Sequence, residues 1–182
     1  SAQQALKLSK NDPQANLLAG RLYHYDHDFN KAIQYFKNVD LDDPSGNVSG
    51  DLKRNTRQHL MYALAADGSP EGIEEAITMA DTGTDLPSLV AQCYAYKRAG
   101  KNEKALATLQ AAQHSTQDPN TNYIFAYVLA DEVSADKVMP LLEASLATDG
   151  LFVFRRDAEQ LKSRLAGETA KIKGKAVKAD EK

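Results

Sequence analysis

The stretch Ala19-Gly20-Arg21-Leu22-Tyr23, followed by Ala32-Ile33-Gln34-Tyr35-Phe36 and then by Pro44, decides how this chain folds. Around it, apolar residues recur three and four positions apart, which predicts two helices that each bury one face. Because Gly20 has no side chain, the helices can approach closely, and the aromatic ring that ends each stretch is expected to fill the space between them. Pro44 is expected to end the second helix, since proline lacks the N–H that a helix interior needs. The sequence therefore predicts an antiparallel helix pair over residues 13–46.

The same pattern returns along the rest of the chain. Three further pairs are expected, over residues 52–80, 89–112 and 122–150, and residues 151–166 have the apolar stripe of one more amphipathic helix. The predicted fold class is therefore all-α. The connection over residues 43–50 is rich in turn-forming residues, so we expect a flexible loop there.

Glycine and proline mark the expected helix ends. Ser69 followed by Pro70 has the pattern of an N-cap and a first helical residue. Gly100 is placed at the turn of the third pair, and that pair is expected to close at Asp118-Pro119. Pro140 is expected in the first turn of its helix, where a missing N–H costs least.

The spacing of Gly20, Tyr23, Ala32 and Phe36 resembles that of a tetratricopeptide repeat (TPR). A second sign is that Ala5-Leu6 precedes Val39 and Leu41 by about 34 residues, the TPR period. The resemblance implies a right-handed superhelical array of about four TPR-like helix pairs with a C-terminal capping helix. The expected organisation is the end of a preceding repeat helix at 1–12, repeats at 13–150, a capping helix at 151–167 and a flexible lysine-rich tail at 168–182.

In TPR proteins the first helix of each pair lines a concave groove that binds a peptide or a helix of a partner. The resemblance assigns basic and aromatic residues to this groove, among them Arg21, His24, Arg54, Arg57, Tyr94, Lys97, Tyr123 and Tyr127, beside Gln14, Leu17, Met61 and Val90. Guanidinium groups pair with carboxylates and aromatic rings add buried area, so an acidic segment is the favoured ligand, with Arg57, Tyr94 and Tyr127 as anchors. The alternative is that these are the solvated charges and partly packed tyrosines of any helical array.

Charge and composition exclude several other classes of function. With 22 basic and 25 acidic residues the net charge is -3, so nothing favours nucleic acid or an anionic membrane. No apolar run is long enough to span a bilayer, so no membrane insertion is expected. The usual phosphate-loop, nucleophile and zinc-protease motifs are absent, and neither an enzyme nor a cofactor is predicted.

Cys93 and the turn around His24 and His27 contain residues that can react or bind metals, but we interpret both as structural. Cys93 lies where the third pair needs a small residue, so it is expected to be a buried apolar residue and not a reactive thiol. His24 and His27 flank a turn with Asp26 and Asp28, which we interpret as a solvated turn with a capping aspartate in preference to a metal site. No metal site is predicted.

The sequence thus predicts a non-catalytic scaffold that binds a protein or peptide in its concave groove. The alternative is an assembly element of a larger TPR protein that self-associates through the repeat ends near residues 1–12. The sequence does not identify the partner or the compartment, although a soluble cytoplasmic protein is favoured over a periplasmic one.

Overall fold

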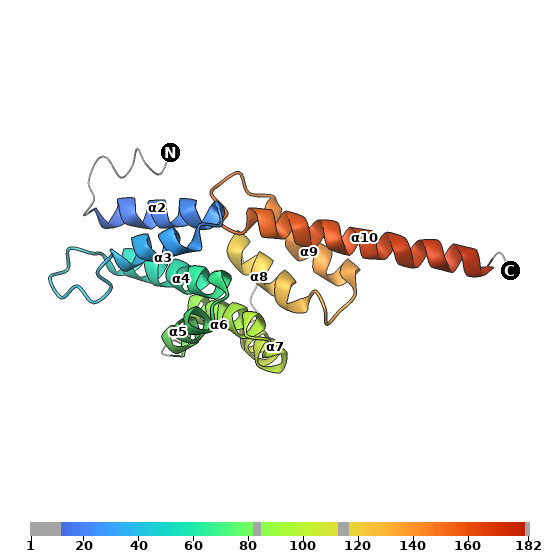
Figure 1. Cartoon of the computed structure of the whole chain (residues 1–182), viewed down its shortest axis with the longest axis horizontal. Helices are drawn as coiled ribbons and strands as arrows, with labels where there is room; N and C mark the ends of the chain where they lie inside the picture. The colour runs from blue at the N-terminus through green and yellow to red at the C-terminus, as the bar shows by residue number, and fades with distance from the viewer. Residues whose placement is uncertain (1–11, 82–84, 113–116, 181–182) are drawn as a thin grey trace. The chain divides into compact units, whose positions relative to one another are not determined.

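The computed structural model describes residues 12–81, 85–112 and 117–180 (Figure 1). Within these ranges the chain forms nine α-helices and no strand, which confirms the all-α class. The helices are α2 (Pro13–Tyr25), α3 (Phe29–Lys37), α4 (Gly50–Asp67), α5 (Pro70–Ala80), α6 (Leu86–Arg98), α7 (Asn102–Ala111), α8 (Pro119–Leu129), α9 (Ala135–Leu146) and α10 (Arg155–Asp180). The repeat helix expected over residues 1–12 lies outside the described residues, apart from Asp12.

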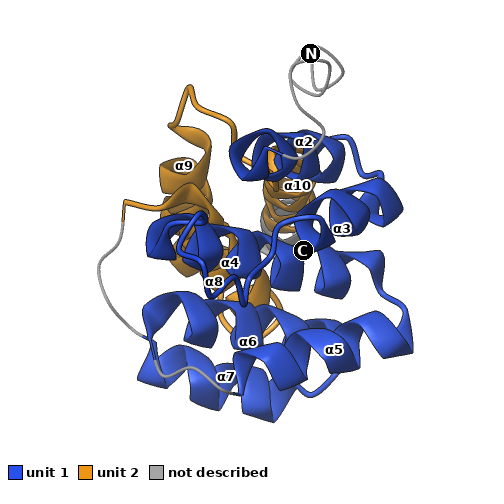
Figure 2. Ribbon diagram, turned by 90° about the vertical axis from the view of Figure 1, so that its left-hand side faces the viewer, with its two compact units in different colours: residues 1–114 blue, residues 115–182 orange. Residues whose placement is uncertain are grey.

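The helices fall into two compact units, residues 1–114 and residues 115–182, coloured separately in Figure 2. In the first unit α2 packs with α3, α4 with α5 and α6 with α7, and successive pairs touch through α3–α4, α5–α6 and α4–α6 contacts. In the second unit α8 packs with α9, and α9 packs with α10. Each predicted pair is therefore present as two consecutive helices in contact.

Short polar side chains set most helix starts. Asp12, Asp85 and Asp118 each accept a hydrogen bond from a backbone N–H in the first turn of the helix that follows, and each of these helices has a proline in its first two positions. Ser69 caps α5 in the same way, with Pro70 as its first residue, as predicted. The pair Asp118-Pro119 opens α8, although the sequence had suggested that it closes the preceding pair.

The contact between Gly20 and Phe36 fixes the packing of α2 on α3. A Cβ atom at Gly20 would lie 2.3 Å from Cε1 of Phe36, far inside van der Waals contact, and Phe36 is fully buried. Tyr23 stacks on Tyr35 of α3, with 5.3 Å between ring centroids. The close approach predicted at Gly20 is therefore confirmed.

Pro44 and Pro140 do not lie where the sequence predicts them relative to the helix ends. Helix α3 ends at Lys37, well before Pro44, and Val39 beyond its C-cap is buried. The end of α3 is thus set by the chain turning inward at Val39, and Pro44 lies in the loop. Pro140 lies inside α9, five residues after its first residue, and not in the first turn.

The connection between α3 and α4 is organised around one carboxylate. Asp43 accepts hydrogen bonds from the backbone N–H of Ser45 and of Val48, each at 2.9 Å, and its backbone carbonyl accepts one from Lys53 Nζ at 2.7 Å. Hydrogen bonds from the Ser45 side chain and then from the Val48 and Ser45 backbone lower the pKa of Asp43 to about 2. Val48 is buried, so the loop that the sequence predicts to be flexible has an internal framework.

Helix α10 runs through residue 167, where the sequence places the end of a capping helix, and continues to Asp180. Its first half packs Ala158, Leu161 and Leu165 into the second unit. Arg164 forms an ion pair with Asp131 at 3.1 Å, and Lys162 approaches Glu143 at 3.6 Å. None of the described helices combines the length and the apolar character needed to cross a membrane.

Candidate peptide-binding surface

The first helices of the first unit form a hollow between α2 and α4. Its volume is about 360 Å³, and its lining combines apolar, amide and charged side chains: Gln14, Leu17, Leu18, Arg21, Ser49, Asp51, Leu52 and Asn55. Leu18 is 41% exposed and is the only large apolar side chain so exposed among the described residues. Exposure of a leucine beside polar groups in a concave site is typical of a surface that binds another chain.

This hollow contains three of the residues that the resemblance assigns to a groove, namely Gln14, Leu17 and Arg21. Leu18 of α2 also lines it, and the remaining residues come from the first two turns of α4 and its N-cap Ser49. Leu18 belongs to the apolar face that the sequence predicts to be buried, and its exposure corrects that expectation. Asn55 was not singled out by sequence reasoning.

His24 lies in the core and not on this surface. Only 1% of the residue is exposed, and its ring meets that of Phe29 edge-on at 5.4 Å. Burial, and secondarily repulsion from His27, lowers its pKa from 6.5 to about 3. A ligand would have to displace core packing to reach this imidazole.

Tyr94 and Tyr123 are also buried, at 3% and 4% exposure. Tyr94 meets Tyr62 of α4 edge-on at 6.4 Å. In the second unit Tyr123 stacks on Phe154 at 4.9 Å, and Tyr127, which is half-buried, stacks on Tyr123 at 6.0 Å. These ring contacts therefore lie within their own units. Of the two tyrosines predicted to be ligand anchors, Tyr94 and Tyr127, Tyr127 is the more exposed.

The remaining predicted residues are basic and differ in their surroundings. Arg54 is exposed and forms an ion pair with Asp51 in the first turn of α4. Arg57 is half-buried, and its Nη2 donates a hydrogen bond of 2.8 Å to the carbonyl of Met79, in the last turn of α5. Lys97 is half-buried in the last turn of α6.

Arginines elsewhere hold helix ends as Arg57 does. Arg98 Nη2 donates to the carbonyl of Ala66 at 3.1 Å, in the last turn of α4, and Arg155 donates to the carbonyl of Thr148, just beyond α9. Unpaired carbonyls and the negative end of the helix dipole favour a cation at such positions. Sequence reasoning missed these hydrogen bonds because the accepting carbonyls are far from the arginines in sequence, 22 residues from Arg57 and 32 residues from Arg98.

We expect the Arg57→Ala variant to lower the free energy of unfolding by about 1–2 kcal/mol, because it removes a charged hydrogen bond to a carbonyl at a half-buried helix end. The matched change Arg54→Ala should cost less than about 0.5 kcal/mol, because its ion pair is exposed. Urea denaturation followed by circular dichroism measures both. Equal effects for the two variants would show that the Met79 contact does not stabilise the fold.

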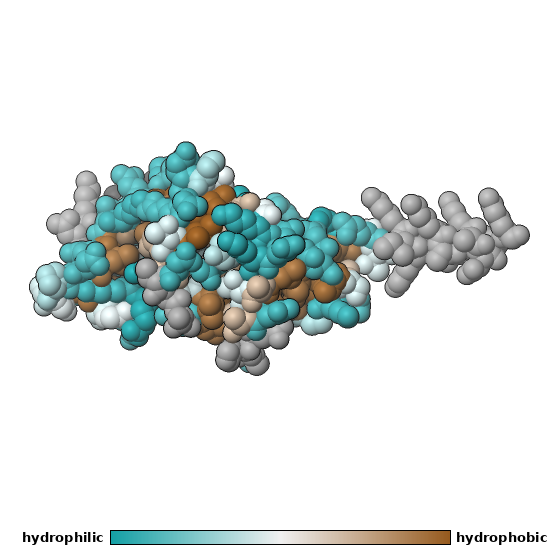
Figure 3. All heavy atoms as spheres, turned by 90° about the horizontal axis from the view of Figure 1, so that it is seen from below, coloured by the Kyte–Doolittle hydropathy of each residue, from teal (hydrophilic) through white to brown (hydrophobic). Residues whose placement is uncertain are grey.

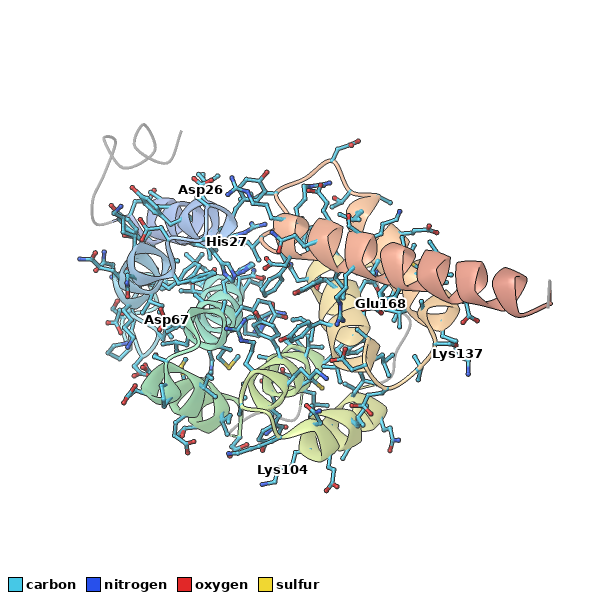
Figure 4. All side chains as sticks on the ribbon, turned by 45° about the vertical axis from the view of Figure 1, so that its right-hand side comes forward. Asp26, His27, Asp67, Lys104, Lys137 and Glu168 are labelled. Atoms are coloured by element: carbon cyan, nitrogen blue, oxygen red, sulfur yellow. The ribbon has the colours of Figure 1, made fainter. Side chains whose placement is uncertain are left out.

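The turn at His27 brings no metal-binding group together. His27 has a positive φ of 62°, its ring stacks on Phe29 at 5.5 Å, and it lies beside Asp26 on the exposed turn (Figure 4). Across the residues that the structure describes, no three His, Cys, Asp or Glu side chains cluster as metal ligands would. Cys93 is fully buried, and burial raises the pKa of its thiol to about 12, so the thiol is protonated at neutral pH.

The chain matches no protein-family model, and the comparisons with curated proteins and with solved structures find no similar protein.

Proposed function

We propose that this chain is a non-catalytic, TPR-like scaffold that binds a peptide or a helix of a partner protein on its first-helix surface. The observation that carries the proposal is the hollow between α2 and α4, where Leu18 is exposed beside Arg21 and Gln14. The repeated contacts of α2–α3, α4–α5 and α6–α7 are those of consecutive stacked helix pairs, as the right-handed superhelical array implied by the resemblance requires.

Rigidity of this surface would favour binding. The hollow is lined by residues of two helices whose starts are capped by Asp12 and Ser49, so little ordering of the scaffold is needed when a ligand arrives. Leu18 would supply a buried apolar anchor, and Arg21 would orient a carboxylate or carbonyl of the ligand. An acidic segment with one apolar side chain remains the favoured ligand class.

The Leu18→Glu variant tests this proposal. Since Leu18 is exposed, the change should alter the free energy of unfolding by less than about 0.5 kcal/mol. It should reduce partner binding at least about tenfold, because an apolar anchor is replaced by a charge. The measurement is a quantitative comparison of the proteins that co-purify with the native chain and with the variant, followed by titration of the recovered partner.

Gln110→Glu on the exposed side of α7 is the matched control, since it adds the same charge on a second helix. Its partners should be those of the native chain. If Leu18→Glu retains the same partners with the same affinity, the hollow between α2 and α4 is not the binding site.

A further inference from the structure

The second unit has an apolar groove between the start of α9 and the middle of α10. Two adjoining hollows of about 550 and 400 Å³ share Ala135, Asp136 and Thr169 in their linings. The groove floor is formed by small and medium apolar side chains: Val133, Ala135, Met139, Leu165, Ala166 and Ala170. Figure 3 shows apolar patches of this kind between hydrophilic side chains on one face of the molecule.

Carboxylates stand at the edge of this groove. Asp136 and Glu168 line it, and both are exposed; Glu168 is marked on α10 in Figure 4. Neither carboxylate forms an ion pair with a described residue, whereas the nearby Asp131 pairs with Arg164. The groove therefore combines an apolar floor with two exposed carboxylates at its edge, of which Asp136 also accepts a hydrogen bond from the Ser134 side chain and lies beside Lys137.

Helix α10 follows the order of the other helices but lacks a second helix in the described part of the chain. The first helices of the pairs begin at Pro13, Gly50, Leu86 and Pro119, and α10 begins at Arg155, so α10 keeps the spacing of a first helix. In the first unit α2, α4 and α6 each pack with a second helix. Within the described part of its unit, α10 makes an extended contact with α9 alone.

We propose that the groove between α9 and α10 docks an amphipathic helix of another protein, whose apolar face is flanked by lysine or arginine. The apolar face of such a helix removes the groove floor from water. Its basic flanks pair with Asp136 and Glu168, which selects against helices with acidic flanks. This surface differs in residues from the hollow at Leu18, and the inference does not rest on the function proposed above.

The test uses the full chain and two synthetic peptides, labelled for fluorescence anisotropy. Both carry one stripe of Leu and Ala at helical spacing, flanked by Lys in one peptide and by Glu in the other. We expect the lysine peptide to bind at least about tenfold more tightly than the glutamate peptide. The double variant Asp136→Lys/Glu168→Lys should reverse this preference.

The control variant Glu159→Lys/Asp149→Lys makes the same change of net charge at exposed positions of the same unit, outside the groove lining, and should keep the native preference. Leu18→Glu should also leave both affinities unchanged, which separates this site from the one between α2 and α4. The proposal is overturned if the lysine peptide does not bind below about 1 mM, or if both peptides bind equally. It is also overturned if light scattering shows a dimer that the double variant dissociates, because the occupant is then a second copy of the chain.

Discussion

Replacing Phe36 by alanine is expected to lower the free energy of unfolding of the first unit by about 3–5 kcal/mol, the cost of deleting a large aromatic side chain from a close-packed core. Phe36 is fully buried, touches the backbone of α2 at Gly20, and stacks on His59 of α4 with 6.0 Å between ring centroids. Its removal therefore leaves a cavity shared by α2, α3 and α4. Urea denaturation monitored by circular dichroism gives the difference.

Gly20→Ala tests the same contact from the other side. The added Cβ would lie 2.3, 2.5 and 2.8 Å from three ring atoms of Phe36, so a helix or the ring must shift, at a cost of about 1–3 kcal/mol. In the Phe36→Ala background the same change should be nearly neutral, because alanine has none of the three ring atoms that the added Cβ meets. A double-mutant cycle measures this coupling.

Gly167→Ala is the matched control, since no atom lies within 4 Å of a Cβ at that helical position. There the change should stabilise α10 by up to about 1 kcal/mol through helix propensity alone. If Gly20→Ala stabilises the chain as Gly167→Ala does, the close approach of α2 and α3 is absent in solution.

The contact at Gly20 also shows what could be predicted from the sequence. The spacing of small and aromatic residues predicted the helix pairs. Local signals predicted helix starts and turns, as at Ser69-Pro70 and Gly100, because a helix cap or a positive φ depends on residues that are neighbours in sequence. Cys93 was correctly placed in the core on the same reasoning. These features are local or periodic, so one sequence is enough to reveal them.

Burial of the first helices could not be predicted in this way. Eight consecutive residues of α4, from His59 to Ala66, are buried, because α4 packs against α2, α3, α5 and α6. A helix surrounded on all sides has no single apolar stripe, so periodicity does not say which of its side chains reach solvent. The burial of Tyr94 and His24 and the exposure of Leu18 likewise depend on which neighbouring helices cover each side chain, and the sequence alone does not give those contacts.

Acid is expected to destabilise the first unit strongly, because two histidines are buried in it. Burial, and then repulsion from Arg21 and His24, lowers the pKa of His59 well below 6.5, and the pKa of His24 is lowered to about 3. Above pH 6.5 both residues are neutral in the folded and unfolded chain, so they contribute no pH dependence. Below pH 6.5 the unfolded chain binds protons that the folded chain does not, so the free energy of unfolding falls as the pH falls.

Well below pH 6.5 the expected slope approaches about 1.4 kcal/mol per pH unit for each histidine, hence about 2.8 kcal/mol per unit for both. The window between about pH 6.5 and 4.5 lies above the range in which Asp28, Asp43 and Asp136, whose pKa values are lowered in the folded chain, contribute in the same direction. Urea titrations at pH 7.5, 6.5, 5.5 and 4.5 measure the slope. A free energy of unfolding that stays flat across these values would contradict the burial of the two rings.

Substitution separates the two histidines from the rest of the molecule. His24→Gln and His59→Gln each introduce a neutral side chain, so each should halve the slope whatever it costs in stability at pH 7.5. His27→Gln is the control on the exposed turn, and it should change the slope little because repulsion from His27 is the smaller cause of the shift at His24. The slope of the free energy of unfolding against pH depends on protonation, whereas the free energy of unfolding at pH 7.5 depends on packing. The variants therefore separate the effect of histidine protonation from the effect of lost packing. The stack of His59 on Phe36 places this titration in the core that the Gly20 variants probe, and acid and overpacking are therefore expected to unfold the same unit.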